Sequence, residues 1–279
     1  MNTSSNPLVT VILPFYNEKK SFLNQSINSI LNQTYKNFEL LLVNDGSNIK
    51  YEIPEDNRIR LLNNSSNLGL GRSINNALKI SRGKYIVRQD SDDISFVYRI
   101  EQQVNLMENN TSIDLCGSSC IIINENNSIL GLRFCGAFHF NIIKQSWKEI
   151  RIQHPTWIVK KSWALSHLYK NLKRGQDQFL LITNKNNSNF YCISKPLVFY
   201  RIKYISLSKR FYGRFSIIYA NIVNRDLINT SFSIIHQFLA TLRDMYMIGF
   251  KSMTIKNIWN INLSIQEIKK YAKIIKSTY

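Results

Sequence analysis

The sequence predicts an α/β nucleotide-binding fold, and three observations support this class. Short, continuous apolar runs rich in β-branched residues, such as 9–13, are typical of buried parallel strands. Segments with apolar residues at helical spacing alternate with these runs. Polar clusters follow the strands directly, at the edge where open α/β sheets bind ligands. Of the 279 residues 44% are hydrophobic, which excludes a disordered basic tail.

The first hundred residues are expected to run strand, helix, strand, strand, helix, strand, which is a nucleotide-binding order. The expected strands are 9–13, 38–43, 58–62 and 84–88. Pro14 is expected to end the first strand. The expected helices are 21–33 and a second one that begins at Gly69 and that Gly83 stops.

Beyond residue 94 the pattern is weaker. It predicts helices at 99–108, 142–150 and 176–183, strands at 114–124 and 128–134, and a helical tail after about 210. No stretch of about 18 apolar residues occurs, so no membrane-spanning helix is expected. The four cysteines show no CxxC pair or dense framework, and we expect them to be reduced, as in a cytosolic protein.

Positive charge is concentrated in the second half of the chain. Residues 1–159 contain 16 basic and 14 acidic residues, a net of +2, whereas residues 160–279 contain 20 and 4, a net of +16. Such a half suits nucleic acid or an anionic membrane surface. Because no nucleic-acid module is recognisable and the tail mixes basic with large apolar residues, a membrane surface is the preferred partner. The alternative is a helical subdomain with a solvated basic rim.

Three carboxylates, Asp90, Asp92 and Asp93, follow the expected strand at 84–88 within four residues. Their mutual repulsion would be relieved by a divalent cation that prefers oxygen ligands. A metal at this edge could bridge diphosphate oxygens and stabilise a leaving nucleoside diphosphate. A solvated turn or helix cap is the structural alternative.

Two further motifs follow strands. At 14–18 an aromatic residue and hydrogen-bonding groups could stack on and bind a base, although an ordinary strand-to-helix turn explains them too. At 44–47 the carboxylate of Asp45 could accept from a base or a ribose hydroxyl, and a type I turn is the alternative.

Taken together these motifs resemble glycosyltransferase family 2, the inverting sugar transferases of GT-A fold. The resemblance is carried by 9–18, Asp45, Asn67-Leu68-Gly69-Leu70-Gly71-Arg72, 82–86 and Asp90-Ser91-Asp92-Asp93. It covers roughly 7–203 and is strongest over 8–101. It implies a GT-A domain with a mixed central sheet at 1–205, divided into a nucleotide-binding half 1–100 and an acceptor half 101–205. A helical basic region follows at 206–279.

The resemblance also implies roles for individual residues of the first half. The residues expected around a nucleotide sugar, most often a uridine one, are Pro14, Tyr16, Glu18, Asp45, Asp90 and Ser91. Asp92 would ligate Mn²⁺ or Mg²⁺ directly, with Asp90 beside it. Arg72 begins a helix and could face the diphosphate, or it could be a surface residue. Asn44 and Val97 depart from the family pattern without removing an expected ligand.

Inverting transfer needs a carboxylate that takes the proton from the acceptor hydroxyl. Asp177 is the sole acidic residue between 160 and 200, and it is the expected base. Gln176 stands where family members typically carry Glu. A helix cap is the alternative role of Asp177.

The remaining expectations concern the acceptor and the diphosphate. By resemblance His154 and Trp157 line the acceptor side, although a structural histidine and a buried tryptophan are the alternatives. Arg201 belongs to a late Tyr-Arg element, and Lys203 stands where the family often has His. Either cation could contact the diphosphate.

The function expected from these features is a metal-dependent inverting transfer of a hexose or N-acetylhexosamine. The donor would be a UDP-sugar, and the acceptor a hydroxyl of a bacterial glycan precursor for lipopolysaccharide, O-antigen or capsule. A lipid-linked acceptor would place the protein in the cytoplasm, peripheral at the inner face of the membrane. The alternatives are a basic nucleic-acid-binding α/β protein and an inactive glycosyltransferase-like scaffold.

Overall fold

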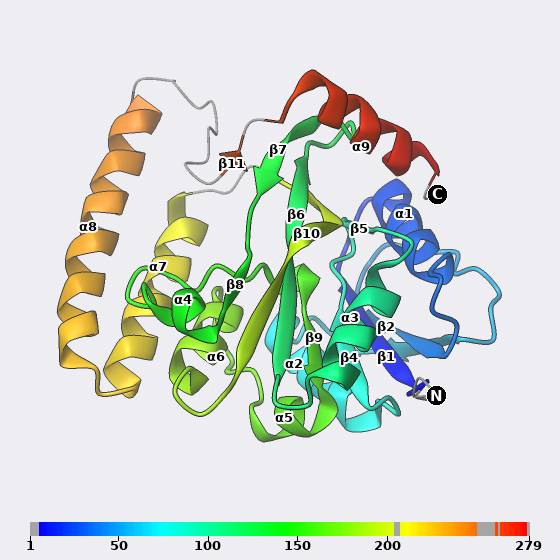
Figure 1. Ribbon diagram of the computed structural model, residues 1–279, viewed down its shortest axis with the longest axis horizontal. Helices are drawn as coiled ribbons and strands as arrows, with labels where there is room; N and C mark the ends of the chain where they lie inside the picture. The colour runs from blue at the N-terminus through cyan, green and yellow to red at the C-terminus, as the bar shows by residue number, and fades with distance from the viewer. Residues whose placement is uncertain (1–5, 204–206, 250–259, 262, 278–279) are drawn as a thin grey trace.

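The computed structural model describes residues 6–203, 207–249, 260–261 and 263–277. Within these ranges one mixed sheet forms the centre of the molecule, in the order β11-β7-β6-β9-β4-β1-β2-β3, with β10 paired to β6, β5 and β8 (Figure 1). This is the α/β architecture with a mixed central sheet that the sequence predicts.

The first half supplies the parallel part of the sheet. The strands are β1 (Val9–Phe15), β2 (Phe38–Asn44), β3 (Ile59–Asn63) and β4 (Tyr85–Arg88). The helices of this half are α1 (Lys20–Leu31), α2 (Leu70–Ile80) and α3 (Arg99–Asn109). Apolar residues on both sides of β1 are fully buried, which explains its continuous hydrophobic run.

The second half adds antiparallel neighbours and one long parallel strand. Strands β6 (Leu115–Ile123), β7 (Ile129–Arg133) and β9 (Ile158–Lys160) extend the sheet, and β9 runs antiparallel to β4. Strand β10 (Phe190–Arg201) lies parallel to β6 with a register shift around Pro196. As a result, the end of β10 reaches the carboxyl end of β4, where Arg201 N donates to Asp93 Oδ1.

Short elements complete this half. They are β5 (Ile94–Ser95), β8 (Ala137–Phe138), α4 (His139–Ile143), a 3₁₀ turn (His154–Thr156), α5 (Lys161–Ser166) and α6 (Gln176–Asn184). Gly175 caps α6 with φ of +76°, and a Cβ there would lie 2.0 Å from Ser216 Oγ. Glycine is therefore required both by the backbone and by the close approach of α6 to the next helix.

The C-terminal helices are α7 (Leu207–Val223), α8 (Leu227–Gly249) and α9 (Ile265–Ser277), with the short β11 (Asn260–Ile261) paired to β7. Helices α7 and α8 lie side by side at one end of the molecule, yellow to orange in Figure 1, and α7 packs on α6. The helical C-terminal region is confirmed. The predicted domain boundary at 205/206 falls in residues outside the described part and stays a prediction.

Several local expectations are wrong. Pro14 lies inside β1, because the strand continues to Phe15, whose carbonyl accepts from Asp45 N. Helix α2 ends at Ile80, before Gly83. Residues 144–148 form turns, and the helix in this region is α4, which ends at Ile143.

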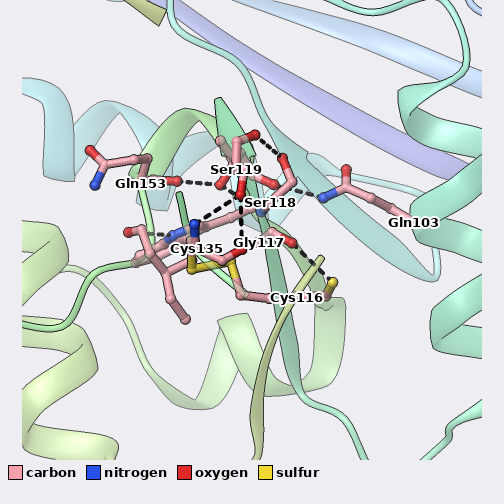
Figure 2. Close-up of a disulfide and its surroundings, with 11 residues drawn as sticks. Gln103, Cys116, Gly117, Ser118, Ser119, Cys135 and Gln153 are labelled. Atoms are coloured by element: carbon pink, nitrogen blue, oxygen red, sulfur yellow. Dashed lines mark hydrogen bonds between the residues drawn. A yellow bond between two sulfur atoms is a disulfide. The ribbon is translucent and has the colours of Figure 1, made fainter. Parts of the chain in front are cut away.

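The expectation of four reduced cysteines is also wrong. Cys135 and Cys192 form a disulfide between the segment after β7 and strand β10, 57 residues apart in sequence (Figure 2). The hydroxyl of Ser119 holds this segment further, because it donates to the Cys135 carbonyl and accepts from the Cys135 amide. Cys116 and Cys120 are free and buried.

Among the helices of the described ranges, none is both long enough and apolar enough to cross a membrane.

Candidate active site

The acidic cluster is brought together at the end of β4. One carboxylate oxygen from each of Asp90, Asp92 and Asp93 lies within 4.8 Å of the others. The buried side chain of Gln89 shapes this turn, since its Nε2 donates to the Asp93 carbonyl at 2.9 Å. Arg88, the last residue of β4, forms an ion pair with Asp90.

The cluster has the character of a cation site. Burial and the charges of Asp92 and Asp90 raise the pKa of Asp93 well above its ordinary value. Burial and, to a smaller extent, the charge of Asp90 also raise the pKa of Asp92. Asp93 Oδ2 is buried without a hydrogen-bond partner. Close carboxylates with an unsatisfied oxygen fit a divalent cation that prefers oxygen ligands.

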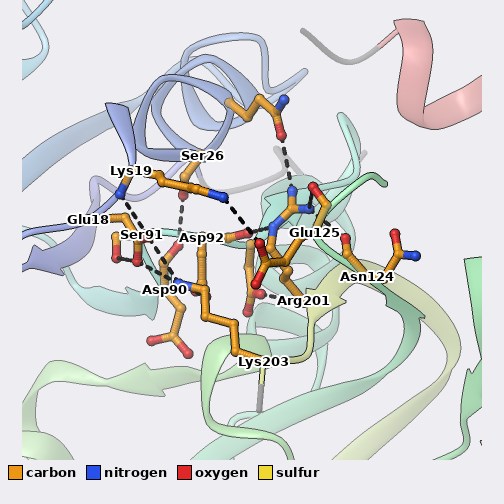
Figure 3. A network of polar contacts seen from close by, with 12 residues as sticks. Glu18, Lys19, Ser26, Asp90, Ser91, Asp92, Asn124, Glu125, Arg201 and Lys203 are labelled. Carbon is orange, nitrogen blue, oxygen red and sulfur yellow. Dashed lines mark hydrogen bonds and ion pairs between the residues drawn. The ribbon is translucent and has the colours of Figure 1, made fainter. Parts of the chain in front are cut away.

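A lysine from the distant end of β10 reaches this cluster. Lys203 Nζ lies 2.9 Å from Asp92 Oδ2 and donates to Glu18 Oε1 and Oε2 at 2.9 and 3.0 Å (Figure 3). Ser91 Oγ donates to Glu18 Oε2 at 3.2 Å. Burial alone would lower the pKa of Lys203, but the charges of Asp92 and Glu18 and the hydrogen bonds to both carboxylates together outweigh it, so the pKa is raised. The ammonium therefore neutralises part of the acidic cluster.

Arg201 lies close to the acidic cluster, but its side chain is buried and bonded within the protein. Its side chain is only 3% exposed, stacks over Phe22 and donates to the carbonyls of Asp92 and Asn124 and to Gln25 Oε1. The guanidinium thereby joins β10 to the turn after β4. This placement gives Arg201 a structural role, and its expected diphosphate contact stays a prediction.

Asp45 is likewise committed within the protein. It is 4% exposed, and its Oδ1 accepts from Asn64 Nδ2, Leu68 N and Ser73 Oγ. Its Oδ2 accepts from Gly69 N at 3.0 Å. The carboxylate orders the loop before α2, and its expected contact with a base or ribose stays a prediction.

The other expected nucleotide ligands differ in exposure. Pro14 is buried in β1, whereas Tyr16 directly after the strand is 46% exposed. Arg72 lies in the first turn of α2 and is exposed, outside the residues that line the main cleft. Tyr16 thus presents an exposed ring directly after the carboxyl end of β1.

A cleft of about 1490 Å³ joins the two halves of the expected site. Asp90 and Lys203 line it from the β4 edge, and Asp177 lines it from the start of α6. The burial of Asp177 raises the pKa of this carboxyl, with a smaller contribution from the charge of Asp90. One carboxylate of the acidic cluster, that of Asp90, and the expected base Asp177 therefore line the same cavity.

Asp177 differs from the other acidic residues of the basic half. Asp226 pairs with Lys185, and Asp244 pairs with arginines of α7 and α8. Glu267 accepts from Ser264 at the start of α9. No salt bridge to Asp177 occurs among the residues that the structure describes.

The two residues expected on the acceptor side differ in their access to the cleft. Trp157 is 1% exposed, packs in the core and donates from Nε1 to the Ile152 carbonyl, so its ring is not open to stack on a sugar. His154 lines the cleft, and its Nε2 lies 2.7 Å from Tyr169 Oη. Burial and the nearby charge of Arg88 lower the pKa of His154 well below its ordinary value, so this imidazole is neutral at pH 7.

Carboxylates at the end of a strand in an open α/β sheet, with a further carboxylate in the same cleft, form an arrangement that can bind a ligand and supply a general base. Residues 10–168 match the model of the glycosyl transferase family 2. The chain belongs to this family and is a glycosyltransferase. An uncharacterised glycosyltransferase of Methanocaldococcus jannaschii is 39% identical over 206 residues, which cover 70% of this chain and 71% of that protein.

One further relative and one solved structure of similar fold carry more specific names. The Escherichia coli UDP-Glc:alpha-D-GlcNAc-diphosphoundecaprenol beta-1,3-glucosyltransferase WfgD is 40% identical over 128 residues, 44% of this chain and 49% of that protein. The crystal structure of S. aureus TarS 1-349 in complex with UDP-GlcNAc superposes with a TM-score of 0.57 at 19% identity, covering 76% and 66% of the two chains. The expected GT-A fold is thereby confirmed.

Sequence reasoning missed several residues that the structure places in the site. Arg88 was a detectable candidate, since it ends an apolar strand run immediately before the acidic cluster. Glu149 lines the cleft, and its pKa is raised by burial. It lies directly after a segment of turns with no local signal. The arginines of α7 and α8 meet only through the packing of two helices.

Proposed function

We propose that the chain is a metal-dependent inverting glycosyltransferase that moves a hexose or N-acetylhexosamine from a UDP-sugar to a hydroxyl of a bacterial glycan precursor. The observation that carries the proposal is the common cleft of Asp90, Lys203 and Asp177. It offers a cation-binding end for a diphosphate and a carboxylate base for an acceptor.

Asp92 and Asp90 are the proposed ligands of Mn²⁺ or Mg²⁺, with Asp93 completing the cluster. A bound divalent cation would neutralise diphosphate oxygens and stabilise the leaving UDP. Glu18 and Ser91 lie in contact with each other beside the cluster and would hold the ribose side of the donor. Tyr16, with its exposed ring, would stack on the base.

Asp177 is the proposed base. Its carboxylate would take the proton of the acceptor hydroxyl as the hydroxyl oxygen attacks the anomeric carbon and the bond to UDP breaks. A half-buried carboxylate with a raised pKa is a stronger proton acceptor than a solvated one, and no salt bridge competes for it in the described part of the chain.

The nature of the substrates is supported by the named relatives. TarS binds UDP-GlcNAc, and WfgD is named for transfer of glucose to a diphosphoundecaprenol-linked sugar. We extend to this chain a UDP-linked donor and a lipid-linked acceptor of lipopolysaccharide, O-antigen or capsule synthesis. The family match assigns sugar transfer as the class and gives no support to the nucleic-acid alternative.

Helices α7 and α8 support peripheral contact with an anionic membrane at its cytoplasmic face. Large apolar side chains on them are exposed, and the most exposed are Leu227 at 81%, Ile228 at 72%, Tyr246 at 63% and Phe238 at 61%. Exposed apolar patches of this extent mark interaction sites, and helices with apolar and basic faces lie at membrane surfaces.

Release of UDP from a panel of UDP-sugars and GDP-sugars, with Mn²⁺ and bacterial lipid-linked acceptors, tests the proposal. We expect release from at least one UDP-sugar to depend on both metal and acceptor. An absence of turnover and of UDP binding across the panel would favour the inactive scaffold.

A further inference from the structure

Three arginines converge on one carboxylate between α7 and α8. Arg210 Nη1 and Arg214 Nη2 lie 3.0 and 2.5 Å from Asp244 Oδ2, and Arg243 Nη2 lies 3.5 Å from Asp244 Oδ1. The Asp244 side chain is 7% exposed. We call these four residues the arginine cluster.

The charges in the arginine cluster do not balance. Three guanidinium groups and one carboxylate give a formal charge of +2 at neutral pH. Burial alone would raise the pKa of Asp244, but the hydrogen bonds from Arg214 and Arg210, together with the charges of these arginines, outweigh burial. The pKa of Asp244 is therefore lowered, and the carboxylate is ionised. His236 lines the same region, and its pKa is lowered first by burial and then by the charges of Lys148 and Arg243. Partly buried positive charge is stabilised by an anionic partner.

The geometry of the cluster is preorganised. Arg210 and Arg214 are four residues apart, so they extend from the same face of α7. Arg214 Nη1 also donates to Thr241 Oγ1 of α8 at 3.0 Å. A guanidinium group has five donors in a planar fork that matches phosphate oxygens.

The location of the cluster connects it to the reaction. All four of its residues line the same cleft as Asp177 and Asp90. They belong to the two helices whose other faces expose large apolar side chains. A phosphate held here would lie in the same cleft as the base, against the two helices that expose apolar side chains.

We propose that the arginine cluster binds a phosphate or diphosphate group of the acceptor, so that the acceptor's hydroxyl is presented to Asp177. This inference rests on the proposed function and deepens it by assigning an anionic acceptor to named residues. The competing explanation is that Asp244 only joins the two helices, in which case the arginines contribute to stability and not to binding.

The test is calorimetric titration of the full chain with farnesyl diphosphate, inorganic pyrophosphate and farnesol. Saturating UDP and Mn²⁺ are present, so that the donor site is filled. Arg243→Gln changes the arginine of the cluster whose side chain is most exposed, at 53%. This variant keeps the ion pairs between α7 and α8, whereas Arg214→Gln removes one of them. Arg225→Gln removes the same charge from the exposed turn between α7 and α8, outside the cleft, and is the matched control.

We expect farnesyl diphosphate to bind the wild type and the control equally, and Arg243→Gln and Arg214→Gln to bind it roughly tenfold or more weakly. Tighter binding of farnesyl diphosphate than of pyrophosphate would identify a lipid-linked acceptor. Equal binding would identify a soluble phosphate-bearing one, and farnesol should not bind. Equal affinities for farnesyl diphosphate in the wild type, Arg243→Gln and Arg225→Gln, or no binding to any of them, would overturn the inference. Failure of the proposed function would give a different result, because the wild type itself would then not bind UDP.

Discussion

The ammonium nitrogen of Lys203 lies 2.9 Å from Oδ2 of Asp92, the expected ligand of a divalent cation. The same nitrogen contacts both carboxylate oxygens of Glu18. A lysine thus stands where the family often has histidine, and it places a positive charge on the acidic cluster. A metal ion that binds Asp92 has to compete with this ammonium group.

Lys203→Met should therefore tighten the binding of Mn²⁺ by the nucleotide-free protein, by roughly threefold to tenfold, since one ion pair no longer competes. An electron paramagnetic resonance titration of free Mn²⁺ measures this directly. Lys19→Met is the control, because Lys19 pairs with Glu125 on the exposed surface nearby. Equal Mn²⁺ affinity in Lys203→Met and the wild type would contradict the competition.

Asp177→Asn should retain UDP binding while turnover falls by about 10²–10⁴-fold, because the amide cannot accept the acceptor proton. Glu149→Gln is the matched control, since Glu149 lines the same cleft and is also buried enough for its pKa to be raised. We expect less than a tenfold loss from the control. Near wild-type turnover in Asp177→Asn, or an equal loss in Glu149→Gln, would remove Asp177 as the base.

The raised pKa of Asp177 has consequences for the pH dependence of stability. Between the ordinary aspartate pKa of about 3.9 and the raised one, the folded chain binds more protons at this group than the unfolded chain does. Its contribution to stability is therefore lost as pH rises through the raised pKa. We expect the Tm of Asp177→Asn to gain on that of the wild type between pH 4 and 8. A difference in Tm that stays constant over this range would argue against the shift.

Replacement of Phe238 and Leu239 on α8 by serine should weaken binding to vesicles of phosphatidylglycerol and phosphatidylcholine by roughly tenfold or more, because buried apolar area drives such binding. Co-sedimentation measures the bound fraction. Leu61→Ser changes a comparably exposed residue on β3 and serves as the control. If both variants sediment like the wild type, the apolar surface of α8 is not the membrane contact.

The sequence predicted the strands and helices of the first half of the fold well for a physical reason. Strands β1, β2 and β4 are buried on both faces, so each is a continuous apolar run followed directly by polar residues. Strand β10 has no such pattern, because Lys195 and Pro196 interrupt it where its register shifts. Its pairing with β6 depends on contacts about 75 residues apart in the chain.

The parts of the candidate site that consist of residues adjacent in sequence were predictable. The parts that are assembled by tertiary packing were not. Asp90, Asp92 and Asp93 are adjacent in sequence, so their cluster could be seen. The roles of Asp45 and Trp157 could not be judged, because burial decides whether a side chain can reach a ligand. The arginine cluster joins residues 30 or more positions apart through one helix contact, which no local pattern reports.

The central claim is that the carboxylates after β4 hold a UDP-linked donor through a divalent cation. Calorimetric titration of UDP into the wild type and Asp92→Ala, each with Mn²⁺ and with a chelator, tests it most directly. We predict that Mn²⁺ strengthens UDP binding by the wild type at least tenfold and that this enhancement disappears in Asp92→Ala. Equal UDP affinity with Mn²⁺ and with the chelator in the wild type would contradict the claim.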